Sequence, residues 1–356
     1  MKKCKTCGEI LEGEEIGFCY TCLEFHNKKY NEKQKEKLYK QYEIANKHKV
    51  LDLFSGCGGL SYGFHRAGFS VVGFIEKWKP AIETYKKNFP EAKHLGTDIT
   101  KIKNSDLEKY KNKIDIITGG PPCQGFSYCG KRDPKDKRNQ LYKEYLRVVS
   151  VISPKIVIIE NVLGIKSMCD VKNKSVLDKI LNELISLNYS VSHKVLVASD
   201  YEVPQNRARL IIIAKKNEFF PESSKRKVNV IDAIKDLPEE ESELNGHILF
   251  NTTKKVLDKI KKLKQGEKIS KKYNFSRQRL NANKPSKTVP TKPIFIHPTY
   301  DRFLTPRELA RLQSFPDSFI FEGTKTSMVK QIGNAVPPKL AFAIAKKIRE
   351  VLENDC

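Results

Sequence analysis

Short apolar runs alternate with amphipathic stretches over most of the chain. The apolar runs predict strands at residues 50–54, 70–75, 114–118, 156–159, 191–197 and 210–214. Amphipathic patterns between them predict helices, for example over residues 80–88, 142–151 and 176–187. Because strands alternate with helices, we expect an α/β fold with a doubly wound, mostly parallel sheet.

This regular pattern breaks once and then returns. Residues 49–216 carry the predicted sheet, but between residues 217 and 287 the alternation fails. Lysine pairs at 254–255, 261–262 and 271–272 stand there, with Arg277 and Arg279 close behind. We expect this segment to be a separate, smaller domain that faces nucleic acid. Regular patterning resumes in residues 288–356, with a helix that begins at Thr305-Pro306 and a last helix over residues 338–352.

Residues 1–27 hold four cysteines, arranged as Cys4-x-x-Cys7 and Cys19-x-x-Cys22. This double spacing is typical of a tetrahedral thiolate zinc site, so we expect a zinc-ribbon-like module with a structural zinc ion. So short a segment cannot bury a core, and the metal would supply most of its folding free energy. The alternative is four unrelated thiols. Residues 28–48, rich in Lys, Glu and Gln, predict a charged helical linker to the body.

The charge balance indicates the kind of partner. The 356 residues include 66 Lys and Arg against 42 Asp and Glu, a formal charge of +24. Such an excess favours a polyanion such as DNA or RNA, although a biased genome composition would also produce it. No apolar run approaches the roughly 18 residues that span a bilayer, so we expect a cytoplasmic protein with no membrane contact. Nine cysteines fit thiol or metal chemistry in a reducing compartment better than a disulfide framework.

One cysteine stands where a nucleophile is expected. Residues 119–127 read Gly-Gly-Pro-Pro-Cys-Gln-Gly-Phe-Ser and place Cys123 on a rigid Pro-Pro turn after a predicted buried strand. Open α/β sheets bind ligands at the carboxyl ends of their strands, so a thiol at this position would lie in the ligand crevice. Considered alone, Cys123 is more simply explained as a small buried apolar residue, and other motifs must decide.

Three features together indicate an adenosine-bearing cofactor. Residues 52–60, Asp-Leu-Phe-Ser-Gly-Cys-Gly-Gly-Leu, follow the first strand and precede a helix, so their glycines let backbone amides approach a ligand at a helix N-terminus. Glu76, after the second strand, is placed to accept hydrogen bonds from a ribose diol. Asp98, after the next segment, could meet an adenine amine. Each feature alone is weak, because glycine turns and strand-end carboxylates are common.

With three further motifs, these residues resemble the DNA cytosine-5 methyltransferases of the bacterial restriction-modification type. The motifs stand in the family's order: Asp52 to Gly59, Pro121-Pro122-Cys123-Gln124, Glu160-Asn161-Val162, Gln205-Asn206-Arg207-Ala208-Arg209 and Gly333-Asn334-Ala335-Val336. The resemblance covers about Val50 to the C-terminus. It implies the fold of S-adenosylmethionine-dependent methyltransferases, with residues 217–287 as the target-recognition domain. The cysteine-rich N-terminal segment departs from the simplest family members.

The resemblance also implies roles for individual residues. Cys123 would attack carbon 6 of cytosine, and Glu160 would hold ring nitrogen 3 and the exocyclic amine. Arg207 and Arg209 stand where the family's paired arginines do, the second contacting the base oxygen. Lys77 occupies a place often taken by an apolar or aromatic residue that packs on adenine. The expected cofactor-binding residues are Phe54, Ser55, Gly56, Gly58, Gly59, Leu60, Glu76, Lys77, Asp98, Ile99, Pro122, Leu141, Asn334 and Ala335.

The chemistry of the reaction agrees with these roles. Cytosine carbon 5 is a poor nucleophile, and addition of a thiolate at carbon 6 lets it attack a methylsulfonium. Protonation or hydrogen bonding at nitrogen 3 assists the addition, which asks for a carboxyl group that burial keeps partly protonated, as expected of Glu160. Singly, Glu160 could be a helix cap and the arginines exposed salt bridges. Because carbon 6 is stacked in a duplex, the base must be flipped out, and residues 125–138 could close over it.

We therefore expect an enzyme that methylates double-stranded DNA, works as a monomer and has a companion restriction endonuclease. Two alternatives stay open: a cytosine-5 methyltransferase acting on transfer RNA, and a non-catalytic nucleic-acid-binding protein. The Gly-Phe-Ser that follows Pro-Cys-Gln favours DNA over RNA. An intact nucleophile, carboxylate and cofactor loop argue against the non-catalytic alternative. An adenine amino-methylating enzyme would need a polar-Pro-Pro-aromatic motif instead of the thiol.

Overall fold

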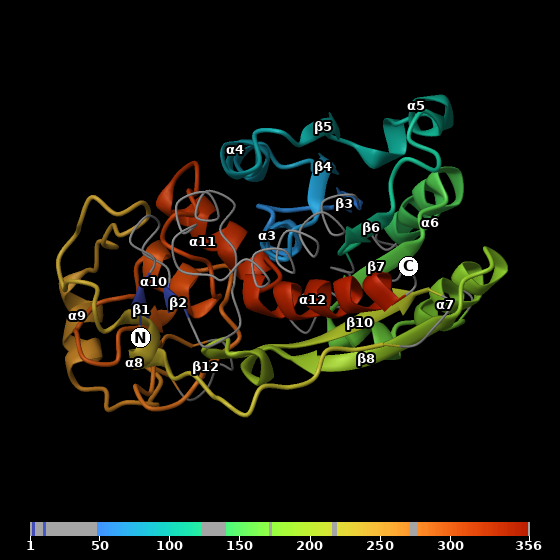
Figure 1. Ribbon diagram of the computed structural model, residues 1–356. Helices are drawn as coiled ribbons and strands as arrows, with labels where there is room; N and C mark the ends of the chain where they lie inside the picture. Colours follow the sequence, from blue (N-terminus) through green and yellow to red (C-terminus); the bar gives the residue numbers. More distant parts are fainter. Residues whose placement is uncertain are drawn as a thin grey trace.

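The central element of the fold is a seven-stranded sheet with the order β5-β4-β3-β6-β7-β10-β8 (Figure 1). The computed structural model describes residues 2–3, 10–11, 48–122, 140–170, 173–215, 219–270 and 276–354. The strands β5, β4, β3, β6 and β7 pair in parallel, whereas β10 runs antiparallel to both β7 and β8. The strands are β3 (Lys49–Leu53), β4 (Ser70–Ile75), β5 (Lys93–Gly96), β6 (Ile116–Gly119), β7 (Ile156–Asn161), β8 (Val191–Val197) and β10 (Ala208–Ala214).

Successive residues of the central strands face two different hydrophobic cores. In β7, Ile156 and Ile158 belong to one core, and Val157 and Ile159 to the other. The first core contains residues of α3 (Gly59–Arg66), α4 (Lys79–Asn88) and α12 (Pro338–Asn354), and the second contains residues of α5 (Asn104–Glu108), α6 (Leu141–Ile152) and α7 (Val176–Ser186). Helices therefore cover both faces, and the predicted α/β fold with a mostly parallel sheet is confirmed.

The chain order creates a topological switch point in the middle of this sheet. From β3 the chain moves outward through β4 and β5, and it then returns to place β6 on the other side of β3. The helices that follow β3 and β6 pack on opposite faces of the sheet. Connections that diverge in this way leave the carboxyl ends of the two strands uncovered, and open α/β sheets bind ligands at such a switch point.

Most predicted elements are present, with shifts of a few residues. The strand predicted at 114–118 spans Ile116–Gly119, and the last helix extends to Asn354. Thr305 caps the helix α10 (Pro306–Leu312), as the sequence predicts, and the structure adds a reciprocal capping box with Glu308. The edge strand β5 was not predicted, because its residues Lys-His-Leu-Gly contain no apolar run. Short 3-10 turns are η1 (Ile99–Lys101), η4 (Leu163–Ser167) and η5 (Ala198–Tyr201).

The described residues of the range 219–304 contain little regular structure and pack beside the C-terminal helices (Figure 1). The elements of this region and its neighbours are β9 (Gln205–Asn206), α8 (Val230–Ile234), α9 (Lys254–Lys261), β11 (Gln278–Arg279), β12 (Ser286–Lys287), β13 (Phe295–Ile296) and α11 (Lys325–Asn334). Val230 and Ile234 share the first core with α12. The domain boundaries at 217 and 287 remain a prediction.

The expectation that Arg279 faces nucleic acid is wrong. Its side chain is 5% exposed and donates to the backbone oxygens of His297, Tyr300 and Ile260 at 2.9 to 3.1 Å. These bonds add side-chain links between α9, the short β11–β13 pair and the loop that follows β13. The physical reason is that a region with a small apolar core uses a buried guanidinium, which carries five donors, to satisfy its carbonyl groups.

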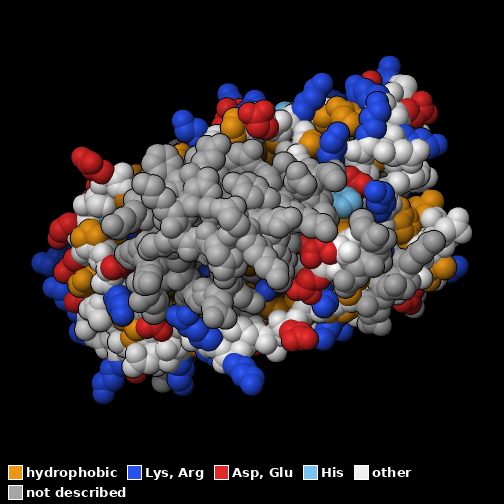
Figure 2. Space-filling model, viewed as in Figure 1, with side chains coloured by type: hydrophobic (Ala, Val, Ile, Leu, Met, Phe, Trp, Pro, Cys, Tyr) orange, Lys and Arg blue, Asp and Glu red, His pale blue; other side chains and the backbone are white. Residues whose placement is uncertain are grey.

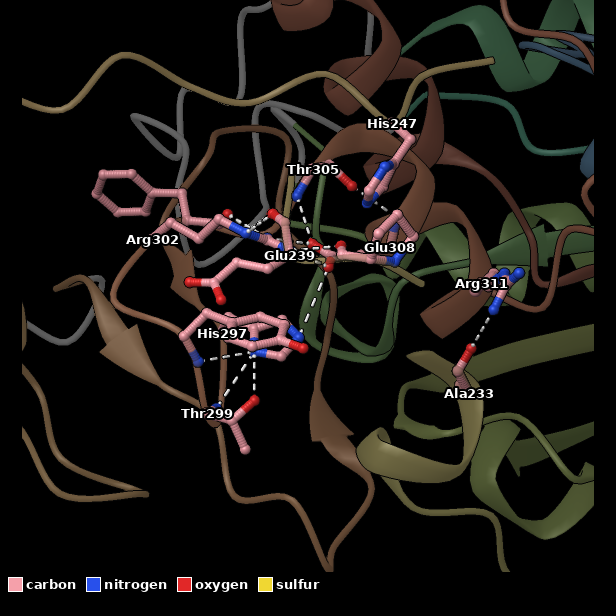
Figure 3. A network of polar contacts seen from close by, with 12 residues as sticks. Ala233, Glu239, His247, His297, Thr299, Arg302, Thr305, Glu308 and Arg311 are labelled. Carbon is pink, nitrogen blue, oxygen red and sulfur yellow. Dashed lines mark hydrogen bonds and ion pairs between the residues drawn. The ribbon is translucent and has the colours of Figure 1, made fainter. Parts of the chain in front are cut away.

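A buried network around Glu308 anchors this region to α10 (Figure 3). Glu308 is fully buried and accepts two hydrogen bonds from Arg302, at 2.8 and 2.9 Å, and one from the backbone of Thr305, at 2.7 Å. His297 Nε2 lies 3.6 Å from Glu308 Oε1. His297 Nδ1 accepts from the backbone N–H groups of Thr299 and Tyr300, so its second nitrogen carries the proton. Protonation of Nδ1 would break both contacts.

Two predictions fall on the N-terminal segment. The strands β1 (Lys2–Lys3) and β2 (Ile10–Leu11) pair antiparallel. Cys4, Cys7, Cys19 and Cys22 lie outside the described residues, as does most of the 28–48 linker. Within the described ranges, no cluster of three or more His, Cys, Asp or Glu side chains suits a metal ion. No helix in the described part of the chain has the length and apolar composition needed to cross a bilayer.

We predict that the neutral state of His297 stabilises the fold. Burial lowers the pKa of His297 to about 4, below the value of about 6.5 in an unfolded chain. Its contribution is therefore present above pH 6.5 and is lost as the pH falls from about 6.5 toward 4, by at most about 3 kcal/mol. Thermal unfolding across this pH range should show a smaller acid loss for His297→Gln than for the parent. The exposed His193 supplies the control, and an equal change in His193→Gln would contradict the assignment.

Candidate functional site

The loop between β3 and α3 has the backbone shape of a ligand-binding turn. Phe54, Gly56 and Gly58 all have positive φ, at 56°, 55° and 94°. A Cβ on Gly58 would lie 2.6 Å from the ring of Phe89, so glycine is required there by both conformation and space. A Cβ on Gly56 would meet no atom of the described residues within 4 Å, so none of them fills the space beside this part of the loop. The loop therefore leaves room for a ligand at the start of α3.

Polar groups beside this space are suited to S-adenosylmethionine. Ser55 is 9% exposed, and its Oγ is buried with no hydrogen-bond partner among the described residues. Glu76 follows β4 directly and accepts from the backbone N–H groups of Gly56, Lys77 and Trp78, each at 2.8 Å. A carboxylate has about four acceptor sites, so Glu76 retains capacity for one of the hydroxyls of a ribose. An unpaired buried hydroxyl and a positioned carboxylate fit a nucleoside cofactor.

Asp98 lies after the next strand, β5, and faces Lys77, which follows Glu76. Asp98 Oδ1 accepts from the backbone and hydroxyl of Thr100 at 3.1 and 2.8 Å, and Lys77 Nζ lies 3.7 Å from Oδ2. The hydrogen bonds from Thr100 hold the pKa of Asp98 below its usual value. Ile99 is buried directly after it. A cavity of about 410 Å³, partly lined by Thr97 and Asp98, opens at this edge of the sheet.

The last motif packs directly on the first. A Cβ on Gly59 would lie 2.3 Å from the backbone oxygen of Val336 and 3.2 Å from Cβ of Ala335. Asn334 ends α11 and is exposed beside this contact, while Ala335 is 6% exposed. The structure thus brings together two motifs separated by more than 270 residues. The other expected cofactor residues are Leu60, which is buried, and Phe54, Pro122 and Leu141, which are partly buried.

The carboxyl end of β6 carries the segment that leads to Cys123. Cys123 itself lies outside the described residues, which stop at Pro122 and resume at Gln140. Asn161 donates to the backbone oxygen of Pro121 at 3.1 Å. A Cβ on Gly120 would lie 3.0 Å from Glu160 Oε2, so a larger residue would require the carboxylate to shift by a few tenths of an ångström. Glu160 is therefore next to the residue three positions before Cys123.

Glu160 and the paired arginines meet across two antiparallel strands. Ile211 of β10 stands opposite Glu160, and Arg209 is the next residue on the same face. Arg209 Nε lies 2.7 Å from Glu160 Oε1. Arg207 is 2% exposed, and its Nε has no hydrogen-bond partner among the described residues. Burial, with the like charge of Arg209, lowers the pKa of Arg207 well below its usual value. The expectation that Glu160 is partly protonated stays a prediction.

Gln205 has a structural function that the sequence analysis did not assign. It is fully buried, and its amide donates to Gln313, whose own amide donates to the backbone oxygen of Ala335 at 2.6 Å. The Oε1 of Gln205 accepts from the backbone of Val289 at 2.7 Å. These bonds link the segment of the paired arginines to the last motif. The only signal in the sequence was a polar glutamine at the start of the motif. Its burial is seen only in the structure.

The two described free cysteines differ from the expected nucleophile. Cys57 lies in the cofactor loop, 1% exposed, with its Sγ 3.7 Å from the backbone oxygen of Gln331. Burial raises the pKa of the Cys57 thiol to about 12, so it carries no thiolate near neutral pH. Cys169 is partly buried, and its backbone forms an isolated antiparallel β-bridge with Ser175, the residue before α7. Cys57 is thus a packing residue.

Comparison with known proteins identifies the family. The family model described as C-5 cytosine-specific DNA methylase matches residues 48–350. The type II methyltransferase M.DdeI of Desulfomicrobium norvegicum is 36% identical, over 86% of this chain and 89% of its own. The type II methyltransferase M1.HphI of Haemophilus parahaemolyticus is 38% identical, over 86% of this chain and 87% of its own.

Solved structures agree with the sequence relatives. A putative DNA modification methyltransferase encoded within an Escherichia coli prophage matches with a TM-score of 0.73 and 32% identity, over 86% of this chain and 99% of its own. The DNMT2 of Spodoptera frugiperda matches with a TM-score of 0.60 at 19% identity, which supports the fold alone. The large mostly parallel sheet is that of S-adenosylmethionine-dependent methyltransferases. The protein belongs to the C-5 cytosine-specific DNA methyltransferase family.

Proposed function

We propose that the protein transfers a methyl group from S-adenosylmethionine to carbon 5 of a cytosine in a specific sequence of double-stranded DNA. The observation that carries this proposal is the meeting of the family's motifs at one switch point. The cofactor loop follows β3, Gly120 follows β6, and Glu160 is the last residue but one of β7, on three adjacent strands of the sheet. Membership of the family, over residues 48–350, supports the reaction and its substrate class.

The cofactor would be held by the first two strand ends. Ser55 and the backbone around Gly56 would bind at the start of α3, Glu76 would accept from the ribose, and Asp98 would meet the adenine amine. Phe54, Leu60, Lys77, Ile99, Pro122, Leu141, Asn334 and Ala335 would complete the surroundings. When bound, the cofactor supplies a methyl group on a positively charged sulfur. The strand ends fix where that group is presented to the base.

Cys123 would act as the nucleophile. Its thiolate adds to carbon 6 of the flipped cytosine, and the electron pair released toward carbon 5 forms the bond to the methyl group. Loss of the proton from carbon 5 to a base then expels the thiolate and restores the ring. The Pro121-Pro122 turn limits the backbone freedom of the segment that carries the thiol, because proline fixes φ.

Glu160 and Arg209 would orient the base. A carboxyl group at Glu160 can bond ring nitrogen 3 and the exocyclic amine, and the guanidinium of Arg209 can donate to the base oxygen. Their 2.7 Å contact holds both side chains in place before the base arrives. Arg207, buried behind them, adds positive charge to the pocket. Prepositioned donors of this kind stabilise charge that develops on the ring during addition.

DNA as the substrate is supported by charge. Figure 2 shows Lys and Arg side chains along the rim of this face, around residues that are not described. Exposed lysines of one such group, at and after α9, are Lys254, Lys255, Lys259, Lys261, Lys262 and Lys264. Phosphate contacts from such groups supply non-specific affinity, which helps to offset the few kcal/mol that base flipping costs. Residues 217–287 would supply the target-recognition domain.

We predict that Cys123→Ser abolishes covalent trapping on a duplex that contains 5-fluorocytosine. Fluorine at carbon 5 cannot leave as a proton does, so the thiol adduct persists and is seen as a shifted band on a denaturing gel. Cys169→Ser, at a free cysteine outside the site, should trap like the parent. Trapping by Cys123→Ser would show that another group is the nucleophile.

We predict that Glu160→Gln lowers the rate of methyl transfer by about a hundredfold or more, because the amide cannot serve as an acid at nitrogen 3. Cofactor affinity should change little, since Glu160 lies at β7 and not at the cofactor loop. Single-turnover transfer of a labelled methyl group and a separate binding titration measure the two effects. A parallel loss of cofactor affinity would contradict this division of roles.

Transfer RNA is the second candidate substrate, because one branch of the family acts on it. The Gly125-Phe126-Ser127 sequence and the type II methyltransferases among the relatives favour DNA. The same labelled-cofactor assay on a DNA duplex and on transfer RNA separates the two substrates.

We also propose that residues 1–27 form a Cys4 zinc module, joined by the 28–48 linker. The double C-x-x-C spacing supports it, and the β1–β2 pairing places short antiparallel strands on either side of Cys4 and Cys7 in the sequence. The module would extend DNA contact. Further proposals are a companion restriction endonuclease, in keeping with the type II relatives, a monomeric state and a cytoplasmic location.

We predict that removal of residues 1–46 weakens DNA binding and lowers its salt dependence while cofactor affinity is unchanged, since each lost phosphate contact reduces the slope by about 0.9. The full chain should carry about one zinc ion by atomic spectroscopy, and the truncated chain none. Loss of cofactor affinity on truncation, or zinc-free full-length protein, would contradict the proposed module.

A further inference from the structure

Asp52 is a buried carboxyl group at the centre of the site to which the proposed chemistry assigns no role. It lies on β3 with 1% of its surface exposed, and β6 places Thr118 directly beside it. Its Oδ2 accepts from Ser61 Oγ at 2.5 Å, and its Oδ1 accepts from Thr118 Oγ1 at 3.1 Å. Both hydroxyl residues are fully buried. One carboxyl group thus bonds two side chains from different segments.

Those two segments lie on the two sides of the switch point between β3 and β6. Ser61 lies in the first turn of α3, immediately after the cofactor loop, and Thr118 lies in β6, two residues before Gly120. Ser61 Oγ also lies 2.6 Å from the hydroxyl of Tyr85 on α4. A displacement of the start of α3 or of the carboxyl end of β6 therefore reaches Asp52 through one hydrogen bond.

We propose that Asp52 is a positioning residue that couples the cofactor loop to the carboxyl end of β6, so that cofactor affinity depends on the protonation state of Asp52. The inference rests on the proposed function for the identity of the cofactor. It concerns only residues that the structure describes.

No cation faces Asp52 among the described residues. The titratable groups around it are Glu76 after β4, Cys57 in the cofactor loop, Tyr85 on α4 and Tyr145 on α6. Burial raises the pKa of Asp52 to about 7, and the charge of Glu76 acts in the same direction. Burial also raises the pKa values of Cys57, Tyr85 and Tyr145, so these groups are neutral where Asp52 titrates.

His94 on β5 is the neighbouring group that needs a control. Its Nε2 lies 3.2 Å from the backbone oxygen of Glu76, and its ring stacks on Phe74 at 4.8 Å. Replacement of His94 therefore tests whether this contact with Glu76, and not Asp52, affects the cofactor loop.

The direction of the effect follows from the hydrogen bonds. An ionised carboxylate accepts from Ser61 and Thr118 more strongly than a neutral acid does. The cofactor loop is therefore held more firmly as the pH rises through 7, and cofactor affinity is expected to increase. Folding stability changes in the opposite sense. A carboxyl group with a raised pKa stabilises the fold when it is protonated, and this contribution is lost as the pH rises from about 4 to 7. Asp52→Asn has no carboxyl group to ionise, so it avoids this decrease in folding stability and is expected to fold at pH 8.

The test is a titration of the full chain with S-adenosylhomocysteine between about pH 6 and pH 8. Trp78 is the single tryptophan of the sequence and stands two residues after Glu76, so its fluorescence can report binding. We expect the dissociation constant of the parent to fall about fivefold or more over this range. The dissociation constant of Asp52→Asn should not change with pH. Thr118→Val should lose most of the pH dependence, and Thr118→Ser, which keeps the hydroxyl, should retain it.

Two controls separate coupling from a general loss of structure. Asp115→Asn removes a carboxylate beside the opposite end of the same sheet, where it pairs with Lys155 at 2.8 Å, and should lower stability while the pH dependence stays. His94→Gln should also keep the dependence. A parent that binds without pH dependence, or an Asp52→Asn variant that keeps it, overturns the inference and leaves the proposed function intact. A parent that fails to bind S-adenosylhomocysteine at any pH overturns both.

Discussion

The site depends on one topological constraint, the reversal of strand order between β3 and β6. The helices that follow these strands pack on opposite faces, and such a divergence is where open α/β sheets bind their ligands. Every described residue of the proposed catalytic and cofactor centre comes from this edge or from a segment packed against it. Parallel pairing makes this convergence possible, since strands that run in one direction bring their carboxyl ends to the same edge.

Close backbone approach then completes the site with residues from the far end of the chain. Gly59 admits the backbone of Val336 at the start of α3, and Gly63 admits Ala341 of α12 on the next turn. A Cβ added to either glycine would lie only 2.3 to 2.4 Å from an atom of this C-terminal segment, so a larger residue would push the two segments apart. The C-terminal helix therefore belongs to the first core as fully as the strands do, and Asn334 and Ala335 are delivered to the cofactor loop by that packing.

The sequence predicted most of what depends on local pattern. Buried parallel strands are continuous apolar runs, and the motifs follow them directly, so strand ends and candidate residues could be located together. Features that depend on tertiary contact were missed. The edge strand β5 carries no apolar run, because an edge needs less burial. Arg279 has the charge of a surface residue, and only the carbonyl groups around it in the fold show that it is structural. Gln205 likewise gains its meaning from Gln313, 108 residues away.

The charges around Glu160 have a consequence for the proposed reaction. One carboxylate faces two guanidinium groups, those of Arg207 and Arg209, so the pocket carries an excess of positive charge. A buried cation without full compensation costs folding free energy, as the lowered pKa of Arg207 indicates. Addition of a thiolate to cytosine brings negative charge into the ring and its oxygen. In the proposed reaction, the positive charge that costs folding free energy would stabilise the adduct, because Arg209 is already oriented by Glu160 and needs no solvent reorganisation.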